Sequence, residues 1–256
     1  LHKAIRRQRQ MCIRDSYGAD MNKYLDSGNE ARIKKAYESR DPRLQMAVIT
    51  PYAQYNGASS GIAHTYTLRW PYRGSDSAEP FDIRTDTNDK FYYLWRKFVP
   101  EGLEQTERDT YGLDIPLIRY AEVLLLKAEA LNEWGSTHES EAIRCVNEVR
   151  RRAGHVELNN ATYPATKVNG QSDLRERIRN EYYWEIGGED SMYFHELRWG
   201  TWKDKKFDNN RNGLMQMWGE TTYTWYWLGD QCWSWPIPAK EMEMNSNLEQ
   251  NEGWIN

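Results

Sequence analysis

The sequence predicts a mainly α-helical fold, built from helical pairs and carrying long aromatic-rich loops. Between residues 115 and 153, two blocks have apolar residues at spacings of three and four, which is the period of an amphipathic helix. Residues 51–112 show no clear period and are rich in Gly, Ser, Asp, Asn, Tyr and Trp. With 256 residues, 39% of them hydrophobic, the chain is long enough to bury a core.

Residues 1–16 differ in charge from the rest of the chain. They hold five Lys or Arg and one Asp, so the other 240 residues hold 29 basic and 37 acidic side chains, a net charge of −8. A basic arm can bind nucleic acid or an anionic membrane. However, Met11–Ser16 look like the in-frame translation of the transposon end that is used to tag sequencing libraries. We therefore expect 1–16 to be non-native sequence and 17–256 to be the C-terminal portion of a larger domain.

The first part of residues 17–256 predicts a helix, a strand and a long loop region. A charged, helix-compatible stretch centres on residues 29–37 and stops at Asp41-Pro42, because proline disfavours helix in the residue before it. The segment from 43 to 50 alternates enough to predict a short strand. In the loop region, the aromatic runs at 66–70 and 91–95 fit strands or turns. A region this long without regular structure is usually functional.

Two consecutive helices are predicted in the centre of the chain. The first covers residues 115–133 and ends before Gly135, and the second covers 139–152 and ends before Gly154, since glycine commonly ends a helix. The predicted buried faces are Ile115, Ile118, Ala121, Leu124, Leu125, Ala128 and Leu131 on the first helix, and Ala142, Ile143, Val146, Val149 and Ala153 on the second. The pair, with alanines at close-packing positions, resembles a tetratricopeptide unit, which needs neighbours to bury its faces.

A third helix is predicted over residues 172–186, with Ser172 as its N-cap and a Gly-Gly pair as its end. Glutamates recur every four residues along and beyond its last turns, at Glu181, Glu185 and Glu189. We expect them to form ion pairs with Arg177 and Arg198 that hold helices in register. Arg119, Glu122 and Glu129 of the first helix are expected to be solvated or to pair within that helix.

The C-terminal part is predicted to be irregular and aromatic. Eight of the 12 Trp residues fall in residues 199–254. Trp235–Pro238 predicts a rigid extended segment in which Trp235 is structural, because each proline fixes its own φ and restricts its predecessor. A last short helix is expected to start in Ala239–Met242. Over the whole chain, 12 Trp and 17 Tyr stand against 5 Phe, and this excess favours a binding protein because Trp and Tyr suit wet surfaces.

The sequence lacks the motifs of several classes of functional site. Cys12, Cys145 and Cys232 have no CxxC spacing, so neither a disulfide framework nor a zinc site is indicated. His195-Glu196 lacks the second histidine of a metalloprotease motif, and no Gly-rich phosphate loop or Gly-x-Ser-x-Gly sequence occurs. The net charge of −8 disfavours nucleic-acid binding. We therefore expect no catalytic residue, metal or cofactor.

Seven motifs follow one another in the order found in a known family. They are Asp41-Pro42-Arg43-Leu44, Trp95-Arg96-Lys97-Phe98, the helix from Arg119 to Glu133 (RYAEVLLLKAEALNE), residues 147–154 (NEVRRRAG), the glutamate-bearing stretch 178–189, Leu197-Arg198-Trp199-Gly200 and the ending from Trp235 to Trp254. Together they resemble the SusD/RagB family, the nutrient-binding outer-membrane lipoproteins of Bacteroidota. The resemblance covers about residues 40–256. It implies an all-helical core of tetratricopeptide-like pairs, with long loops that hold an aromatic glycan site.

The resemblance also implies a location and partners. Members of the family sit at the cell surface as a lid on a SusC-like TonB-dependent transporter barrel, and they bind an oligosaccharide or other nutrient without cleaving it. The family's signal peptide, lipid-bearing cysteine and first helical repeats do not occur in this sequence, so the chain resembles the C-terminal portion of a member. It departs from the usual pattern at Met192 and His195, where the family has arginine and aspartate, and this puts a local charge pair in doubt.

The candidate glycan site lies mainly in the loop region before the first predicted helix, where the family's ligand contacts largely lie. Sugars present flat C–H faces and hydroxyl groups, so their sites need exposed aromatic rings and polar side chains. The predicted glycan-binding residues are Tyr52, Tyr55, Asn56, Trp70, Tyr72 and Arg73, together with Trp225 and Trp227. The alternatives are a helical glycoside hydrolase, which requires two carboxylates about 5–10 Å apart across a cleft, and a peptide-binding repeat scaffold, which requires a concave groove.

Overall fold

The structure is a computed structural model of the whole chain. It describes residues 40–50, 52–59, 62–69, 82–84, 94–102, 112, 114, 116–189, 191–206 and 227–254. The chain divides into two units, Leu1–Met192 and Tyr193–Asn256, called here the N-terminal and C-terminal units. Helices dominate, as the sequence predicts. The segment 1–16 and the helix expected around residues 29–37 lie outside the described residues.

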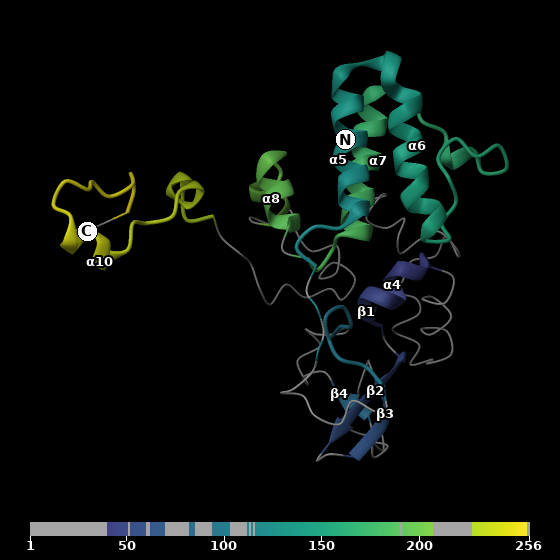
Figure 1. Cartoon of the computed structure of the whole chain (residues 1–256), viewed down its shortest axis with the longest axis horizontal. Helices are drawn as coiled ribbons and strands as arrows, with labels where there is room; N and C mark the ends of the chain where they lie inside the picture. Colours follow the sequence, from purple (N-terminus) through teal and green to yellow (C-terminus); the bar gives the residue numbers. More distant parts are fainter. Residues whose placement is uncertain are drawn as a thin grey trace. The chain divides into compact units, whose positions relative to one another are not determined.

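Three helices of the N-terminal unit pack side by side: α5 (Tyr120–Trp134), α6 (Glu139–Arg152) and α7 (Gln171–Glu185) (Figure 1). A single turn of 3-10 helix, η1 (Ser136–His138), joins the first two. Leu125, Ala128 and Val146 are fully buried between these helices. The predicted helical pair is therefore confirmed, with α7 as a third helix packed on it, whereas its likeness to a tetratricopeptide unit stays a prediction.

The observed bounds correct two of the predicted helix starts. The first helix begins at Tyr120 rather than Ile115, and Ile118, predicted to be buried, is 74% exposed. Arg119, the N-cap of this helix, has an extended backbone conformation, with φ of −112° and ψ of 148°. The third helix has Gly170 at its N-cap in place of Ser172, with φ of 84°, a conformation that glycine adopts without steric penalty.

The segment predicted as a strand from 43 to 50 is mainly a helix, α4 (Pro42–Ala47), followed by the short strand β1 (Val48–Ile49). Asp41 is the N-cap of α4, and its Oδ1 accepts a hydrogen bond from the Arg43 backbone N–H at 3.0 Å. An acidic N-cap followed by proline at the first helical position is a strong start signal. The strand prediction was wrong because Asp41-Pro42 was interpreted only as a helix end.

The loop region also contains strands. β1 pairs antiparallel with β5 (Leu94–Trp95), whereas β2 (Gln54–Ser59) and β3 (Ile62–Arg69) form an antiparallel hairpin to which β4 (Asp82–Arg84) adds in parallel (Figure 1). The hydrophobic side chains that join the two sheets are Ile49, Tyr55 and Leu68, with Ala53, Tyr66 and Leu94 at their edge. This small core positions the hairpin, which carries part of the candidate glycan site.

The C-terminal unit contains short elements: most of α8 (Ser191–Arg198), then α9 (Trp202–Lys206), η4 (Asp230–Trp233) and α10 (Ala239–Met244). The last of these confirms the predicted short helix. Trp235 is 79% exposed, and the structural role that we expected for its ring stays a prediction. None of the described helices is both long and apolar enough to cross a lipid bilayer.

Candidate functional site

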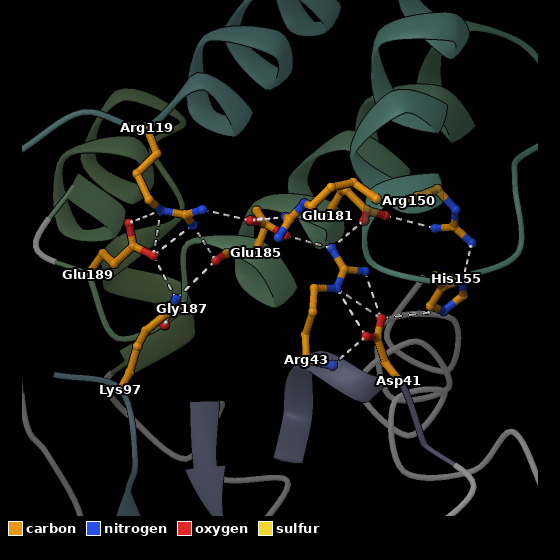
Figure 2. Close-up of polar contacts among 11 residues, drawn as sticks. Asp41, Arg43, Lys97, Arg119, Arg150, His155, Glu181, Glu185, Gly187 and Glu189 are labelled. Atoms are coloured by element: carbon orange, nitrogen blue, oxygen red, sulfur yellow. Dashed lines mark hydrogen bonds and ion pairs between the residues drawn. The ribbon is translucent and has the colours of Figure 1, made fainter. Parts of the chain in front are cut away.

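The C-terminal end of α7 is the centre of a network of ion pairs (Figure 2). Glu181 is fully buried and accepts hydrogen bonds from Arg43 Nη1 at 2.7 Å and from Arg150 Nη1 at 2.8 Å. One turn further along, Glu185 accepts from Arg43 Nη1 at 3.1 Å and from Arg119 Nη1 at 2.8 Å. The members of this α7 charge network are Asp41, Arg43, Lys97, Arg119, Arg150, Arg152, Glu181, Glu185 and Glu189.

Glu181 and Glu185 share one side of α7 because residues four apart lie one above the other on a helix, and Glu189 follows four residues after the helix ends. The prediction that these glutamates form ion pairs is confirmed, but the predicted partners are wrong. Arg177 pairs with Asp173 on its own helix at 2.9 Å, and Arg198 Nη2 lies 3.2 Å from Nδ1 of His195. The cations come instead from segments far away in the sequence, which no helical spacing reveals.

Arg119 also differs from expectation. Arg119 does not pair within its helix, since its Nε and Nη2 donate to Glu189 at 2.9 and 2.7 Å. Glu122 is buried rather than solvated. Arg119 lies just before the first turn of α5, so its side chain reaches the end of α7, and α5 packs along α7. The network therefore ties α5 to α7 as well.

Two members of the network fasten the small sheet to α7. Arg43 lies on α4 just before β1, and Lys97 lies just after β5. Lys97 Nζ donates to Glu189 Oε1 at 2.6 Å and to the carbonyl oxygens of Glu185 at 3.0 Å and Gly187 at 3.1 Å. A cation at the C-terminal end of a helix is favoured by the helix dipole. Both strands of the sheet are thus clamped to the same helix end.

Burial and charge act in opposite directions on the carboxyl groups of the network. Burial by itself raises the pKa of Asp41, but hydrogen bonds from Arg43 outweigh it and bring the pKa below its ordinary value. For Glu185, burial again raises the pKa, whereas Arg119, Arg152 and Arg43 lower it further than burial raises it. The net pKa shift of both carboxyl groups is downward, so both are ionised at neutral pH. These groups hold the elements together and are poorly suited to donate a proton.

The β2–β3 hairpin has one buried and one polar face. The register pairs Tyr55 with Tyr66, and Gln54 with Thr67 and Asn56 with Thr65 on the opposite side, because side chains alternate along a strand. Tyr55, predicted to contact the glycan, is only 8% exposed, and its hydroxyl donates to the carbonyl oxygen of Pro100 at 2.6 Å. The ring of Tyr55 therefore supports the hairpin, whereas Asn56 lies on the polar face.

Tyr52 lies beside the end of the hairpin and has a left-handed backbone conformation, with φ of 63°. Its N–H donates to the carbonyl oxygen of Leu68 at 2.7 Å. A bulky residue at positive φ is strained, and such strain concentrates at functional sites. Three predicted residues, Trp70, Tyr72 and Arg73, follow β3 in the sequence and lie outside the described residues.

Trp227 belongs to an aromatic cluster of the C-terminal unit, whereas Trp225 lies outside the described residues. The ring centroid of Trp227 lies 4.9 Å from that of Trp233 and 5.8 Å from that of Trp202. Lys203 Nζ lies 4.8 Å from the Trp227 ring centroid, a cation–π contact. Trp227 is therefore in the other unit from the hairpin residues, and the prediction that it contacts glycan stays a prediction.

The sequence-based prediction missed the clamp residues Arg43 and Lys97 and the polar hairpin residue Thr65. A signal for the first two was present, since each lies in one of the seven motifs, DPRL and WRKF. For the hairpin, the signal was the turn-forming pair Ser60-Gly61, followed by a run of strand-forming residues at 62–68.

Comparison with known proteins places these features in a family. The profile of the SusD family matches residues 13–254. The SusD-like protein P38 of Formosa agariphila is 32% identical over 139 residues, or 54% of this chain and 24% of that protein. The starch-binding protein SusD of Bacteroides thetaiotaomicron is 28% identical over 161 residues, or 62% of this chain and 25% of that protein. The chain thus matches about a quarter of the length of these relatives.

The fold also resembles that of solved structures. A crystal structure of a SusD-like protein from Bacteroides fragilis superimposes with a TM-score of 0.57 and 22% sequence identity. The superposition covers 88% of this chain and 41% of that structure. The predicted mainly helical, SusD-like fold is therefore confirmed.

Proposed function

The chain belongs to the SusD family, and on that premise we propose that it binds a glycan at a bacterial cell surface and passes it, uncleaved, to a transporter. The observation that carries the proposal is the family match over residues 13–254, joined by the similarity to a starch-binding protein. The proposed partners are an oligosaccharide and a SusC-like TonB-dependent barrel. The proposed location is the outer membrane, through a lipid anchor.

The geometry of the hairpin supports a sugar-binding role. Its polar face presents amide and hydroxyl groups at Asn56 and Thr65, and sugars are recognised by such groups. The strained Tyr52 stands at the end of the hairpin from which the chain continues to Trp70. The α7 charge network clamps both strands beneath the hairpin, and a rigid support lowers the entropy that binding must overcome.

The electrostatics favour binding over hydrolysis. A glycosidase needs a carboxylic acid with a raised pKa beside a second carboxylate. Glu181, Glu185 and Glu189 are the regularly spaced carboxylates of this chain, and each is paired with arginine or lysine. The pKa of Glu185 is shifted downward, despite the upward effect of burial, by its arginine partners. We therefore propose that the protein does not cleave the sugar it binds.

Calorimetric titration of the protein with maltoheptaose, xylohexaose, laminarihexaose and trigalacturonic acid tests the proposal, with chromatography of each sugar afterwards. We expect saturable binding of at least one sugar without cleavage. Because a tryptophan at the centre of a site contributes much of the affinity, Trp70→Ala should weaken binding by about tenfold or more. Trp134→Ala is the matched control, since Trp134 is 76% exposed on α5 and stacks on His138. Cleavage of a sugar, or no binding of any of the four, contradicts the proposal.

A further inference from the structure

Asn56 and Thr65 face each other directly across the hairpin. The Asn56 N–H donates to Glu101 Oε1 at 3.4 Å, and its carbonyl oxygen accepts from the N–H of Gly102 at 3.2 Å. The backbone groups of Asn56 thus point away from β3, although Asn56 and Thr65 are directly opposite in the register. They form a non-hydrogen-bonded pair, in which side chains approach most closely.

The side chains of this pair are joined by one hydrogen bond, from Thr65 Oγ1 to Asn56 Oδ1 at 2.8 Å. An amide has one oxygen acceptor and two N–H donors. Because Thr65 occupies the oxygen, the amide orientation is fixed, and the Nδ2 group has no hydrogen-bond partner among the residues that the structure describes. Thr65 Oγ1 has donated its proton and keeps lone pairs that accept a hydrogen bond.

The charged side chain that lies nearest to the backbone of Asn56 is itself paired. Glu101 accepts the hydrogen bond from the Asn56 N–H, and its carboxylate pairs with Arg96 at 2.9 Å. Arg96 also donates to the carbonyl oxygens of Gln45 and Gln54, which fixes this segment against β2. Among the described residues beside the pair, the charge of Glu101 is thus balanced by that of Arg96.

From these contacts we propose that Asn56 and Thr65 together bind two neighbouring hydroxyl groups of a neutral sugar, and that Thr65 positions the Asn56 amide. One hydroxyl oxygen accepts from Asn56 Nδ2, and the other hydroxyl donates to Thr65 Oγ1. A carboxylate satisfies only half of this arrangement, because it has no proton to donate. The inference rests on the proposed function and adds to it the chemical class of the ligand and a positioning residue.

Titration of the full chain with the same four sugars tests the pair. Asn56→Asp keeps the shape and the acceptor but removes both donors, and we expect affinity for the bound neutral sugar to fall about tenfold. Thr65→Val keeps the shape but removes the hydroxyl, and should weaken binding about three- to tenfold. Thr65→Ser restores the hydroxyl and should bind like the wild type. Thr137→Val, an exposed threonine on η1, is the matched control and should have no effect.

A positioning role for Thr65 predicts a further result, which a purely structural role does not predict. The double variant of Asn56→Asp and Thr65→Val should lose less affinity than the sum of the two single losses, because part of the effect of Thr65 acts through the Asn56 amide. Melting temperatures of all variants should match the wild type. Additive losses, an unchanged Thr65→Val, or binding of trigalacturonic acid alone overturns the inference while the proposed function stands. Absence of binding to all four sugars by the wild type overturns both.

Discussion

Replacing Glu181 by glutamine tests whether the α7 charge network holds this fold together. Glu181 is fully buried between Arg43 and Arg150, at 2.7 and 2.8 Å (Figure 2). Glutamine keeps the shape, but it offers one acceptor oxygen where the carboxylate offers two, and its NH₂ group meets a guanidinium that can only donate. One of the two arginines is therefore left facing a donor, in a place that water does not reach.

The expected loss of stability follows from the remaining partners. Removing one member of a buried ion pair typically destabilises a protein by about 3–5 kcal/mol. Arg43 keeps Asp41 at 2.6 Å and Glu185 at 3.1 Å, whereas Arg150 keeps the carbonyl oxygen of Val156. We therefore expect the lower end, about 3 kcal/mol, which for a protein of this size lowers the melting temperature by about 6–12 °C.

Thermal unfolding followed by circular dichroism measures this change. Glu141→Gln is the matched control, because Glu141 pairs with Lys127 at 2.7 Å on the surface. Exposed ion pairs contribute little to stability, so this variant should melt like the wild type. If Glu181→Gln and Glu141→Gln both melt within a degree of the wild type, the network does not hold the fold and the reasoning from burial is refuted.

Three further predictions concern the α7 charge network and a glycine that follows the end of α7. The pKa of Glu185 lies below its ordinary 4.5, because burial raises this pKa but the arginine partners lower it more. The ion pairs of Glu185 therefore stabilise the fold fully above pH 4.5, and this stabilisation is lost as the pH falls through the folded pKa. The melting temperature of the wild type should accordingly fall more steeply in acid than that of Glu185→Gln, and parallel curves would contradict this. Lys97→Met should speed amide hydrogen exchange in β5, the strand that precedes Lys97, whereas Lys127→Met should not. Equal exchange rates in the two variants would show that the contacts of Lys97 are not needed to hold this strand. Gly188→Ala should lower the melting temperature more than Gly200→Ala, since both glycines have positive φ but only at Gly188 would a Cβ lie 2.7 Å from an indole ring; equal losses would show that the ring moves aside freely.

The helical part of the fold was predictable because its signals are local. The second helix has the predicted bounds of 139–152, and its buried face follows the spacing of its apolar residues. Apolar periodicity and a terminal glycine both act within a few residues. The same local logic failed at Asp41-Pro42, because this dipeptide ends a preceding helix and also starts a following one.

The clamp and the hairpin were not predictable in the same way. Arg43 and Glu181 are 138 residues apart in the sequence, so their pairing depends on the tertiary fold and not on any spacing. Tyr55 and Asn56 were both assigned to the glycan site, yet they point to opposite faces of β2. In a recognised strand, the alternation of side chains assigns Tyr55 and Asn56 to opposite faces. However, the sequence of this region has no hydrophobic period that identifies the strand.

The positions of Arg43 and Lys97 suggest how a buried network can influence a surface site. The hairpin lies between these two residues in the sequence, and both are fixed to the end of α7. Fixing the ends of a segment reduces the conformational freedom that is lost when a ligand orders it. We therefore expect Glu181→Gln to weaken glycan binding by about two- to fivefold at a temperature where it is still folded, together with its loss of stability, whereas Thr65→Val should weaken binding at an unchanged melting temperature. If folded Glu181→Gln binds as tightly as the wild type, the hairpin is ordered by its own core of Ile49, Tyr55 and Leu68, and the network serves stability alone.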